Sequence, residues 1–163
     1  MYKNIKVLKK TIFKDHRGYY WTTWKKGNFI KKKFIHDKFS ISKKNTLRGF
    51  HCDFKTWKMI SCVYGKVMFV TVDMKKKSKN YLKHKKWILE HRKPKIILIP
   101  PYFANAYLCL SKECVFHYKL SYKGNYIDSN LQSSFRWNDP KFKIKWPIKK
   151  PILSKRDRTS NFL

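Results

Sequence analysis

Acidic residues are scarce in this chain of 163 residues: nine Asp and Glu stand against 40 Lys and Arg, a formal net charge of +31 at pH 7. This balance excludes an acidic interaction tail and makes nucleic acid, an anionic membrane surface or a phosphorylated ligand the candidate partners. The sequence also lacks an RNP motif, a zinc finger and a basic-region helix. Nucleic-acid binding is therefore a secondary interpretation, which rests on charge alone, and contact with a membrane surface stays open.

Cysteine spacing and hydrophobic runs exclude further classes. The cysteines form no CxxC pair, so neither a zinc site nor a dithiol redox motif is indicated. No apolar run reaches the ~18 residues of a membrane span, and the first residues lack the apolar stretch of a signal peptide. We expect a cytoplasmic protein with reduced thiols. The length suits one domain over residues 1–163, and 42% hydrophobic residues are enough to form its core.

The middle of the chain is rich in β-branched and aromatic residues, in short runs separated by turn signals. These runs predict strands over 58–64, 66–74, 87–89, 96–99, 107–110 and 115–122. Only 22–33 has weak helical character, and the proline-punctuated last third is expected to be extended chain that wraps the body. Short strands of this kind are typical of a sandwich or barrel. The predicted fold class is all-β, a small barrel or jelly roll with an extended C-terminal tail.

Histidines are the first candidates for acid–base chemistry in this chain. His84 and His91 lie among lysines and are expected in surface loops, whereas His51 lies on or beside a strand. Arg48 and Lys58 flank His51 at offsets that allow all three to face one cavity. Metal-binding barrels usually present His-x-His, a carboxylate and a later His. The sequence has no His-x-His, so we expect no metal.

Nine short motifs point to a known family. They are DHRGY at 15–19, LRGFH at 47–51, Lys58 followed by VYG at 63–65, VD at 72–73, PPYFAN at 100–105, YK at 118–119, WND at 137–139, IKWP at 144–147 and LSKRD at 153–157. In order and spacing they resemble the dTDP-4-dehydrorhamnose 3,5-epimerase family of cupin-type sugar-nucleotide epimerases, over about residues 5–158. The resemblance implies a cupin jelly roll, no metal or redox cofactor, and a homodimer with N-terminal strand exchange. It also implies a nucleotide-diphosphate sugar with a ketone at C4 as substrate.

The resemblance assigns catalytic roles to four residues. His51 corresponds to the base that removes a proton beside the ketone, and Asp157 to the carboxylate that orients it. Tyr118 corresponds to the general acid that returns a proton to the opposite face. Lys58 corresponds to a lysine near the ketone, where a fixed cation stabilises the enolate oxygen.

Substrate-binding positions follow from the same resemblance, and some depart from the family pattern. Arg17 and Arg48 match arginines that hold the diphosphate. Asn105 stands where the rhamnose enzymes have a second histidine, and His36 and Lys38 replace a Gln-x-Asn pair. These three are the expected contacts of an altered sugar or base site.

Two further departures concern carboxylates: one expected in the central strand is replaced by Phe69, and one expected soon after the first Arg-Gly motif by Thr22. The variant segments, among them 36–39 and 55–58, are similar to epimerases of GDP-linked 4-keto-6-deoxy-heptose. The predicted function is therefore an epimerase that inverts C3, C5 or both in a dTDP-hexose or GDP-heptose, for surface polysaccharide synthesis. A sugar-nucleotide 3,4-ketoisomerase, a cupin without turnover and a basic nucleic-acid-binding barrel are the alternatives.

Overall fold

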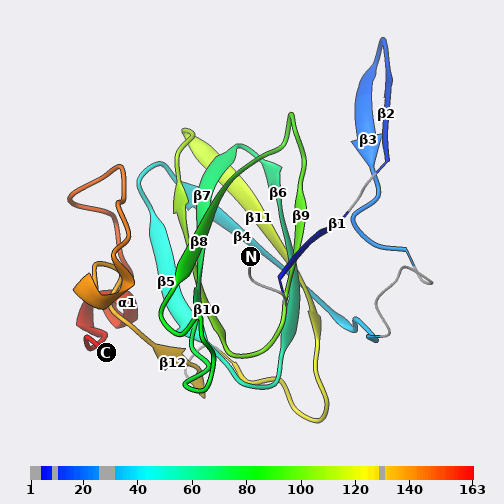
Figure 1. Ribbon diagram of the computed structural model, residues 1–163. Coiled ribbons are helices and arrows are strands. Elements are labelled where there is room, and N and C mark those ends of the chain that lie inside the picture. The colour runs from blue at the N-terminus through cyan, green and yellow to red at the C-terminus, as the bar shows by residue number, and fades with distance from the viewer. Residues whose placement is uncertain (1–4, 9–10, 26–31, 129–130) are drawn as a thin grey trace.

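The computed structural model describes residues 5–8, 11–25, 32–128 and 131–163. Two antiparallel sheets face each other and form a jelly-roll barrel (Figure 1). The first sheet contains, in spatial order, β1 (Lys6–Leu8), β9 (Ile96–Ile99), β6 (Trp57–Tyr64), β11 (Glu113–Ser121) and β4 (His36–Lys43). The second contains β12 (Ser133–Ser134), β5 (Leu47–Cys52), β10 (Phe103–Cys109), β7 (Lys66–Asp73) and β8 (His84–Glu90). The all-β prediction and each of the six predicted strands are confirmed.

A hairpin of β2 (Ile12–Asp15) and β3 (Gly18–Trp21) projects from the barrel (Figure 1). Its aromatic residues pack on each other instead of in a core: the rings of Phe13 and Tyr20 stack with centroids 5.1 Å apart, and both are exposed. The Tyr19 hydroxyl donates to the carbonyl oxygen of His91 and ties the hairpin to the barrel.

The central strands of the second sheet, β7 and β10, are buried on both faces, which explains why they are almost wholly apolar. Its inner face joins the barrel core, where Phe69 and Tyr107 pack with Phe116 of the first sheet. Its outer face is covered by the C-terminal segment, with Phe142 packed against Phe50. The last third of the chain is therefore held in place by a core of its own.

Two short helices correct the prediction of a purely extended C-terminal third. Pro140 begins the 3-10 helix η2 (Pro140–Phe142), and Asp139 caps it by accepting the N–H of Lys141. Ser154 begins α1 (Lys155–Thr159), and its side chain accepts the N–H of Asp157. A serine followed three residues later by an acid is a helix-start pattern, and it was overlooked between the prolines.

Other local predictions were also wrong. Residues 22–25 and 32–33 show no helix, and the remainder of the weak helical candidate lies outside the described residues. His84 is the first residue of β8 and is half-buried. Its Nδ1–H donates to the Phe142 carbonyl oxygen at 2.8 Å. His91, just after β8, donates likewise to the Gly65 carbonyl oxygen at 3.1 Å. The loop prediction is therefore wrong for His84, which lies in a strand, but it is confirmed for His91, which lies in a turn.

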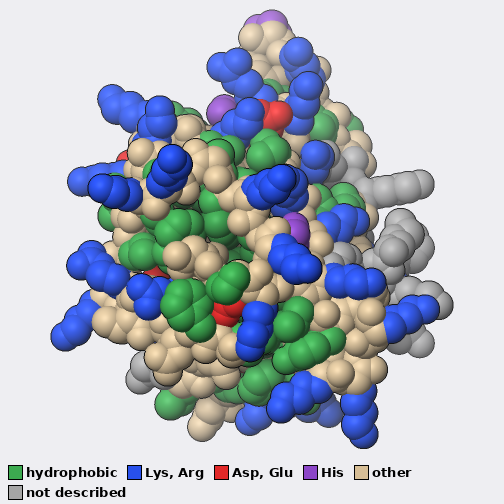
Figure 2. All heavy atoms as spheres, turned by 60° about the vertical axis from the view of Figure 1, so that its left-hand side comes forward, with side chains coloured by type: hydrophobic (Ala, Val, Ile, Leu, Met, Phe, Trp, Pro, Cys, Tyr) green, Lys and Arg blue, Asp and Glu red, His purple; other side chains and the backbone are tan. Residues whose placement is uncertain are grey.

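The fold uses several of its few acids internally. Asp53, Asp73, Asp139 and Asp157 are each only 3% exposed. The first three accept backbone N–H groups of the turns that follow them. Little negative charge is left at the surface, and Figure 2 shows Lys and Arg side chains spread over the visible face, with hydrophobic patches between them. Within the described residues, no helix is both long and apolar enough to span a membrane.

Candidate active site

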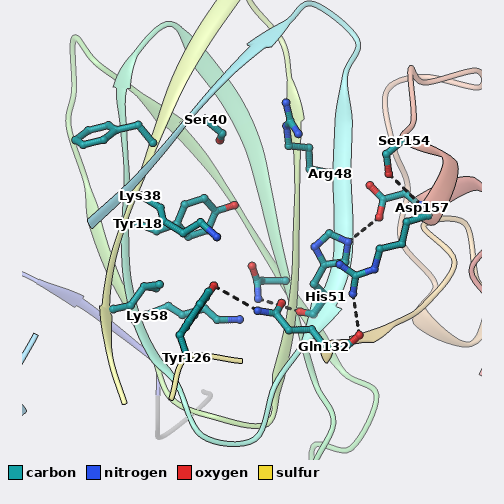
Figure 3. A pocket seen from close by; sticks show the side chains of 14 residues that line it. Lys38, Ser40, Arg48, His51, Lys58, Tyr118, Tyr126, Gln132, Ser154 and Asp157 are labelled. Atoms are coloured by element: carbon teal, nitrogen blue, oxygen red, sulfur yellow. Dashed lines mark hydrogen bonds and ion pairs between the residues drawn. The ribbon is translucent and has the colours of Figure 1, made fainter. Parts of the chain in front are cut away.

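A pocket of about 390 Å³ opens between the two sheets beside α1 (Figure 3). Both sheets and the C-terminal segment contribute side chains to it. They are Lys38, Phe39 and Ser40 of β4, Arg48 and His51 of β5, Lys58 of β6, Asn105 of β10, Tyr118 and Leu120 of β11, and Tyr126, Gln132, Ser154, Arg156 and Asp157. The pocket thus brings together seven of the nine residues that the sequence predicted for the site.

His51 and Asp157 form a hydrogen-bonded pair at the edge of this pocket. The His51 Nε2 lies 2.6 Å from the Asp157 Oδ1, and the carboxylate is almost fully buried. Burial opposes ionisation of Asp157, but the bonds from His51 and the Gly49 N–H outweigh it and hold the pKa of Asp157 below its usual value. With Nε2–H donated to the carboxylate, the neutral ring has Nδ1 free to accept a proton.

The glycine of the motif LRGFH lets β5, which carries His51, pack closely against β10. Gly49 has φ +115°, and a Cβ there would lie 2.5 Å from the carbonyl oxygen of Asn105 on the neighbouring strand β10. Only glycine allows that approach. Asn105 in turn donates its Nδ2–H to the backbone carbonyl oxygen of His51 at 3.0 Å, which fixes the end of β5 against β10.

Tyr118 projects from β11 into the pocket, as Figure 3 shows. Its ring packs edge-on against Phe116, with centroids 4.9 Å apart. Burial, with a smaller contribution from nearby Tyr107, raises the pKa of the Tyr118 hydroxyl well above its usual value. The group therefore keeps its proton at neutral pH.

Arg48 and Lys38 supply positive charge to the pocket. The Arg48 side chain donates to the Ser42 Oγ at 3.0 Å and to the carbonyl oxygen of Ile41 at 3.2 Å. The Lys38 ammonium lies 4.9 Å above the ring of Tyr126 and 3.7 Å from the Asp128 carboxylate. Both cations are thereby held beside the space that an anionic ligand would fill.

Lys58 is the most enclosed cation of the pocket. Its side chain is 8% exposed, and its Nζ lies 2.9 Å from the Oδ2 of Asp53, whose side chain is 0% exposed. Asp53 was not among the predicted site residues. Burial opposes its ionisation, but the Lys58 charge and the N–H bond from Thr56 outweigh burial and lower the pKa of Asp53.

Two predicted substrate contacts do not line this pocket. His36 lies behind it: its Nδ1 is 3.2 Å from the Tyr122 hydroxyl oxygen, and its ring packs edge-on against Tyr126. Arg17 lies in the turn of the β2–β3 hairpin, where it pairs with Asp15 at 2.7 Å and its side chain is 77% exposed. Within a single copy of this chain, Arg17 is not part of the pocket.

Asp53 lies behind the pocket wall, and seven of the residues that line the pocket were also not predicted, among them Arg156, Gln132 and Tyr126. Arg156 donates to the carbonyl oxygen of Gln132 at 2.7 Å, and the Gln132 Nε2 donates to the carbonyl oxygen of Ile127 at 2.9 Å. Arg156 directly precedes Asp157 in the motif LSKRD at 153–157, and this position could have indicated that Arg156 belongs to the site. Gln132 and Tyr126 lie in a segment without periodicity, so the sequence held no comparable signal. Among the described residues, no three His, Cys, Asp or Glu side chains cluster as metal ligands would.

This chain is similar to known proteins over nearly all of its length. The family model described as dTDP-4-dehydrorhamnose 3,5-epimerase matches residues 2–163. The enzyme of that name from Salmonella typhimurium is 30% identical, covering 98% of this chain and 91% of its own. The enzyme from Shigella flexneri is 29% identical over 94% of this chain and 88% of its own.

Two crystal structures extend the comparison to three dimensions. The dTDP-6-deoxy-D-glucose-3,5-epimerase of Legionella pneumophila, in complex with dTDP-4-keto-L-rhamnose, superimposes with a TM-score of 0.88 at 27% identity, over 97% of this chain and 87% of its own. The dTDP-4-dehydrorhamnose 3,5-epimerase of Bacillus anthracis, with TDP and PPi bound, gives 0.89 at 28% identity, over 98% and 94%. Since the family model spans nearly all of the sequence and the fold agrees, the chain belongs to the dTDP-4-dehydrorhamnose 3,5-epimerase family, isomerases with a cupin-like jelly-roll fold.

Proposed function

We propose that this chain inverts C3, C5 or both in a nucleotide-linked 4-keto-6-deoxy sugar, with His51 as base and Tyr118 as acid. The observation that carries the proposal is the shared pocket: a histidine paired with a buried carboxylate, a protonated tyrosine and an enclosed lysine all line it. This set suits removal of a proton next to a ketone and its return from the other side.

The steps balance without a further reagent. Nδ1 of His51 takes the proton from the carbon next to the C4 ketone, and the C–H electron pair becomes an enolate. Asp157 stabilises the imidazolium that results. Lys58 stabilises the negative charge on the enolate oxygen. Tyr118 then donates its hydroxyl proton to the opposite face of that carbon, which inverts the centre, and His51 and Tyr118 regain their resting protonation by exchange with solvent.

The cations of the pocket support a diphosphate-linked substrate. Arg48, Arg156 and Lys38 line it, and arginine forks are suited to phosphate oxygens. A dTDP-linked hexose is the first candidate, because the relatives are named for dTDP sugars. A GDP-linked heptose is the second, since Lys38 and Asn105, which line the pocket, depart from the rhamnose-type pattern.

We also propose that residues 1–163 act as one domain and work as a homodimer. Supporting this, the outer face of the first sheet exposes Ile41 and Tyr64, 63% and 53% accessible, on either side of Val115. The hairpin with Arg17 projects away from its own barrel (Figure 1). In a dimer that exchanges N-terminal segments, Arg17 would reach the pocket of the other copy and hold its diphosphate.

Solvent deuterium incorporation tests the proposed function. Freshly made dTDP- and GDP-linked 4-keto-6-deoxy sugars are incubated with the protein in D2O and followed by NMR. We expect deuterium at C3, C5 or both with the wild type and with His91→Ala, a histidine outside the pocket, but not with His51→Ala. Equal labelling by wild type and His51→Ala, or no labelling by the wild type with either nucleotide, would contradict the proposal. The labelled carbon identifies the inverted centre.

A further inference from the structure

Asp53 and Lys58 form an ion pair whose two side chains are 0% and 8% exposed, at the wall of the pocket. We propose that Asp53 is a positioning residue, which keeps the Lys58 ammonium charged and fixed beside the substrate ketone. The inference rests on the enolate-stabilising role proposed above for Lys58. Asp53 itself does not line the pocket, so it acts only through the lysine.

The β5–β6 loop holds the Asp53 carboxylate in a fixed orientation. Its Oδ1 accepts the backbone N–H groups of Lys55 at 3.1 Å and Thr56 at 2.6 Å. The Asp53 carbonyl oxygen accepts the N–H of Tyr102, which ties the loop to the turn between β9 and β10. One carboxylate oxygen is thus engaged by the loop, and the other, Oδ2, faces the Lys58 ammonium at 2.9 Å.

The charges around the pocket explain why Lys58 needs such a partner. The titratable and charged side chains that line it besides Lys58 are His51 and Arg48 of β5, Lys38 of β4, Tyr118 of β11, Tyr126, and Arg156 and Asp157 of α1. Three of these are cations that repel the ammonium. Of the carboxylates nearby, Asp157 is engaged by His51. A buried ammonium among like charges loses its proton unless a counter-charge is close, and Asp53 supplies that charge.

A departure from the family pattern points the same way. The carboxylate expected in the central strand is Phe69 in this chain, a fully buried residue of the barrel core. Strand β7 therefore offers the pocket no negative charge at that position. The buried carboxylate comes instead from Asp53, the first residue of the Asp53–Thr56 turn. It precedes Lys58 by five residues along the chain.

Asp53→Asn is the most direct test, since its amide oxygen still accepts the loop N–H groups while the charge facing Lys58 is removed. Asp73→Asn is the matched control: Asp73 is equally buried and accepts the Lys75 N–H through Oδ1, but its Oδ2 accepts from the Ser78 hydroxyl. If Asp53→Asn does not fold, Asp53→Ser replaces it, because a serine hydroxyl also accepts turn N–H groups.

The decisive readout is the dependence of kcat on pH. In Asp53→Asn we expect Lys58 to lose its proton at lower pH, so the alkaline limb of the kcat profile should move to lower pH. At pH values above the limb, kcat should fall about tenfold for each pH unit by which the limb moves. The wild type and Asp73→Asn should keep the original limb. In a Lys58→Arg background, where the charge persists at all pH values, the limb that reports Lys58 should be absent, and Asp53→Asn should not change the pH dependence of kcat. An equal loss of kcat at every pH would assign Asp53 a structural role only and overturn the inference.

A second measurement decides the inference without turnover. The Lys58 side-chain carbon resonance, identified by its absence in Lys58→Met, is followed by NMR from pH 6 to 11 in each variant. Earlier proton loss in Asp53→Asn than in Asp73→Asn supports the inference, and coincident curves refute it. Absence of epimerisation by the wild type would instead refute the proposed function and leave this result standing.

Discussion

The imidazole Nε2 of His51 lies 2.6 Å from the carboxylate Oδ1 of Asp157, although 106 positions separate them in the chain. The pair forms because the C-terminal segment packs across the outer face of the second sheet, where Phe142 contacts Phe50 beside His51 on β5. The short helix α1 then turns Asp157 toward the end of that strand. Hydrophobic packing between the C-terminal segment and the outer face of the second sheet thus brings Asp157 to His51.

Asp157→Asn should lower kcat by roughly 10²–10⁴-fold with a much smaller change in KM, because the carboxylate orients the base and stabilises its charged form. Steady-state kinetics on the keto sugar measure both constants. Asp139→Asn, also buried but in the η2 cap, is the control and should keep its kcat. A rise in KM with unchanged kcat would place Asp157 in binding instead.

Tyr118→Phe separates the two proton transfers. The variant retains His51 and Lys58, so it should still form the enolate and still exchange deuterium from D2O into the substrate. Inversion should fall on the order of 10²–10⁴-fold, because no donor remains on the opposite face. NMR reports exchange and inversion in the same sample. Loss of exchange together with inversion would mean that Tyr118, not His51, removes the proton.

Much of the fold could be predicted because its central strands are both apolar and β-branched. Strand β4 was not predicted, because its hydrophobic residues Phe39 and Ile41 face outward. The serines that alternate with them face the barrel interior. Ser40 and Ser42 hydrogen bond there to the hydroxyl of buried Tyr107, at 2.8 and 2.9 Å. A hydroxyl in the core requires polar partners. The sequence around β4 does not show that its serines meet this requirement.

The site was predictable in the same uneven way. His51, Tyr118 and Asp157 belong to quoted motifs, and the family resemblance was enough to select them. Asp53 belongs to no motif, and its importance depends on a buried ammonium that only the three-dimensional arrangement reveals. Arg17 belongs to the recognisable motif DHRGY, but the motif does not say whether Arg17 contacts the pocket of its own subunit or that of a second copy.

Stability toward acid should depend on Asp157. Its pKa is lower in the folded chain than the ordinary value of 3.8, so its contribution to stability is complete above that value and is lost as pH falls through the folded pKa. The wild-type Tm should therefore fall as the pH drops below about 4. Asp157→Asn should be less stable than the wild type at pH 7, and the difference in Tm should shrink in acid. Calorimetry across this range checks the prediction; parallel curves for the two proteins would contradict it.

Subunit complementation tests where Arg17 acts. Arg17→Ala and His51→Ala should each have low activity alone. If the proteins are mixed, unfolded and refolded together, half of the dimers pair one subunit of each kind. In such a dimer the subunit with intact His51 receives the intact Arg17 of its neighbour, so about a quarter of all pockets regain activity. If Arg17 served its own pocket, every pocket in the mixture would lack one of the two residues. An activity no higher than that of the separate variants would therefore exclude the exchanged hairpin.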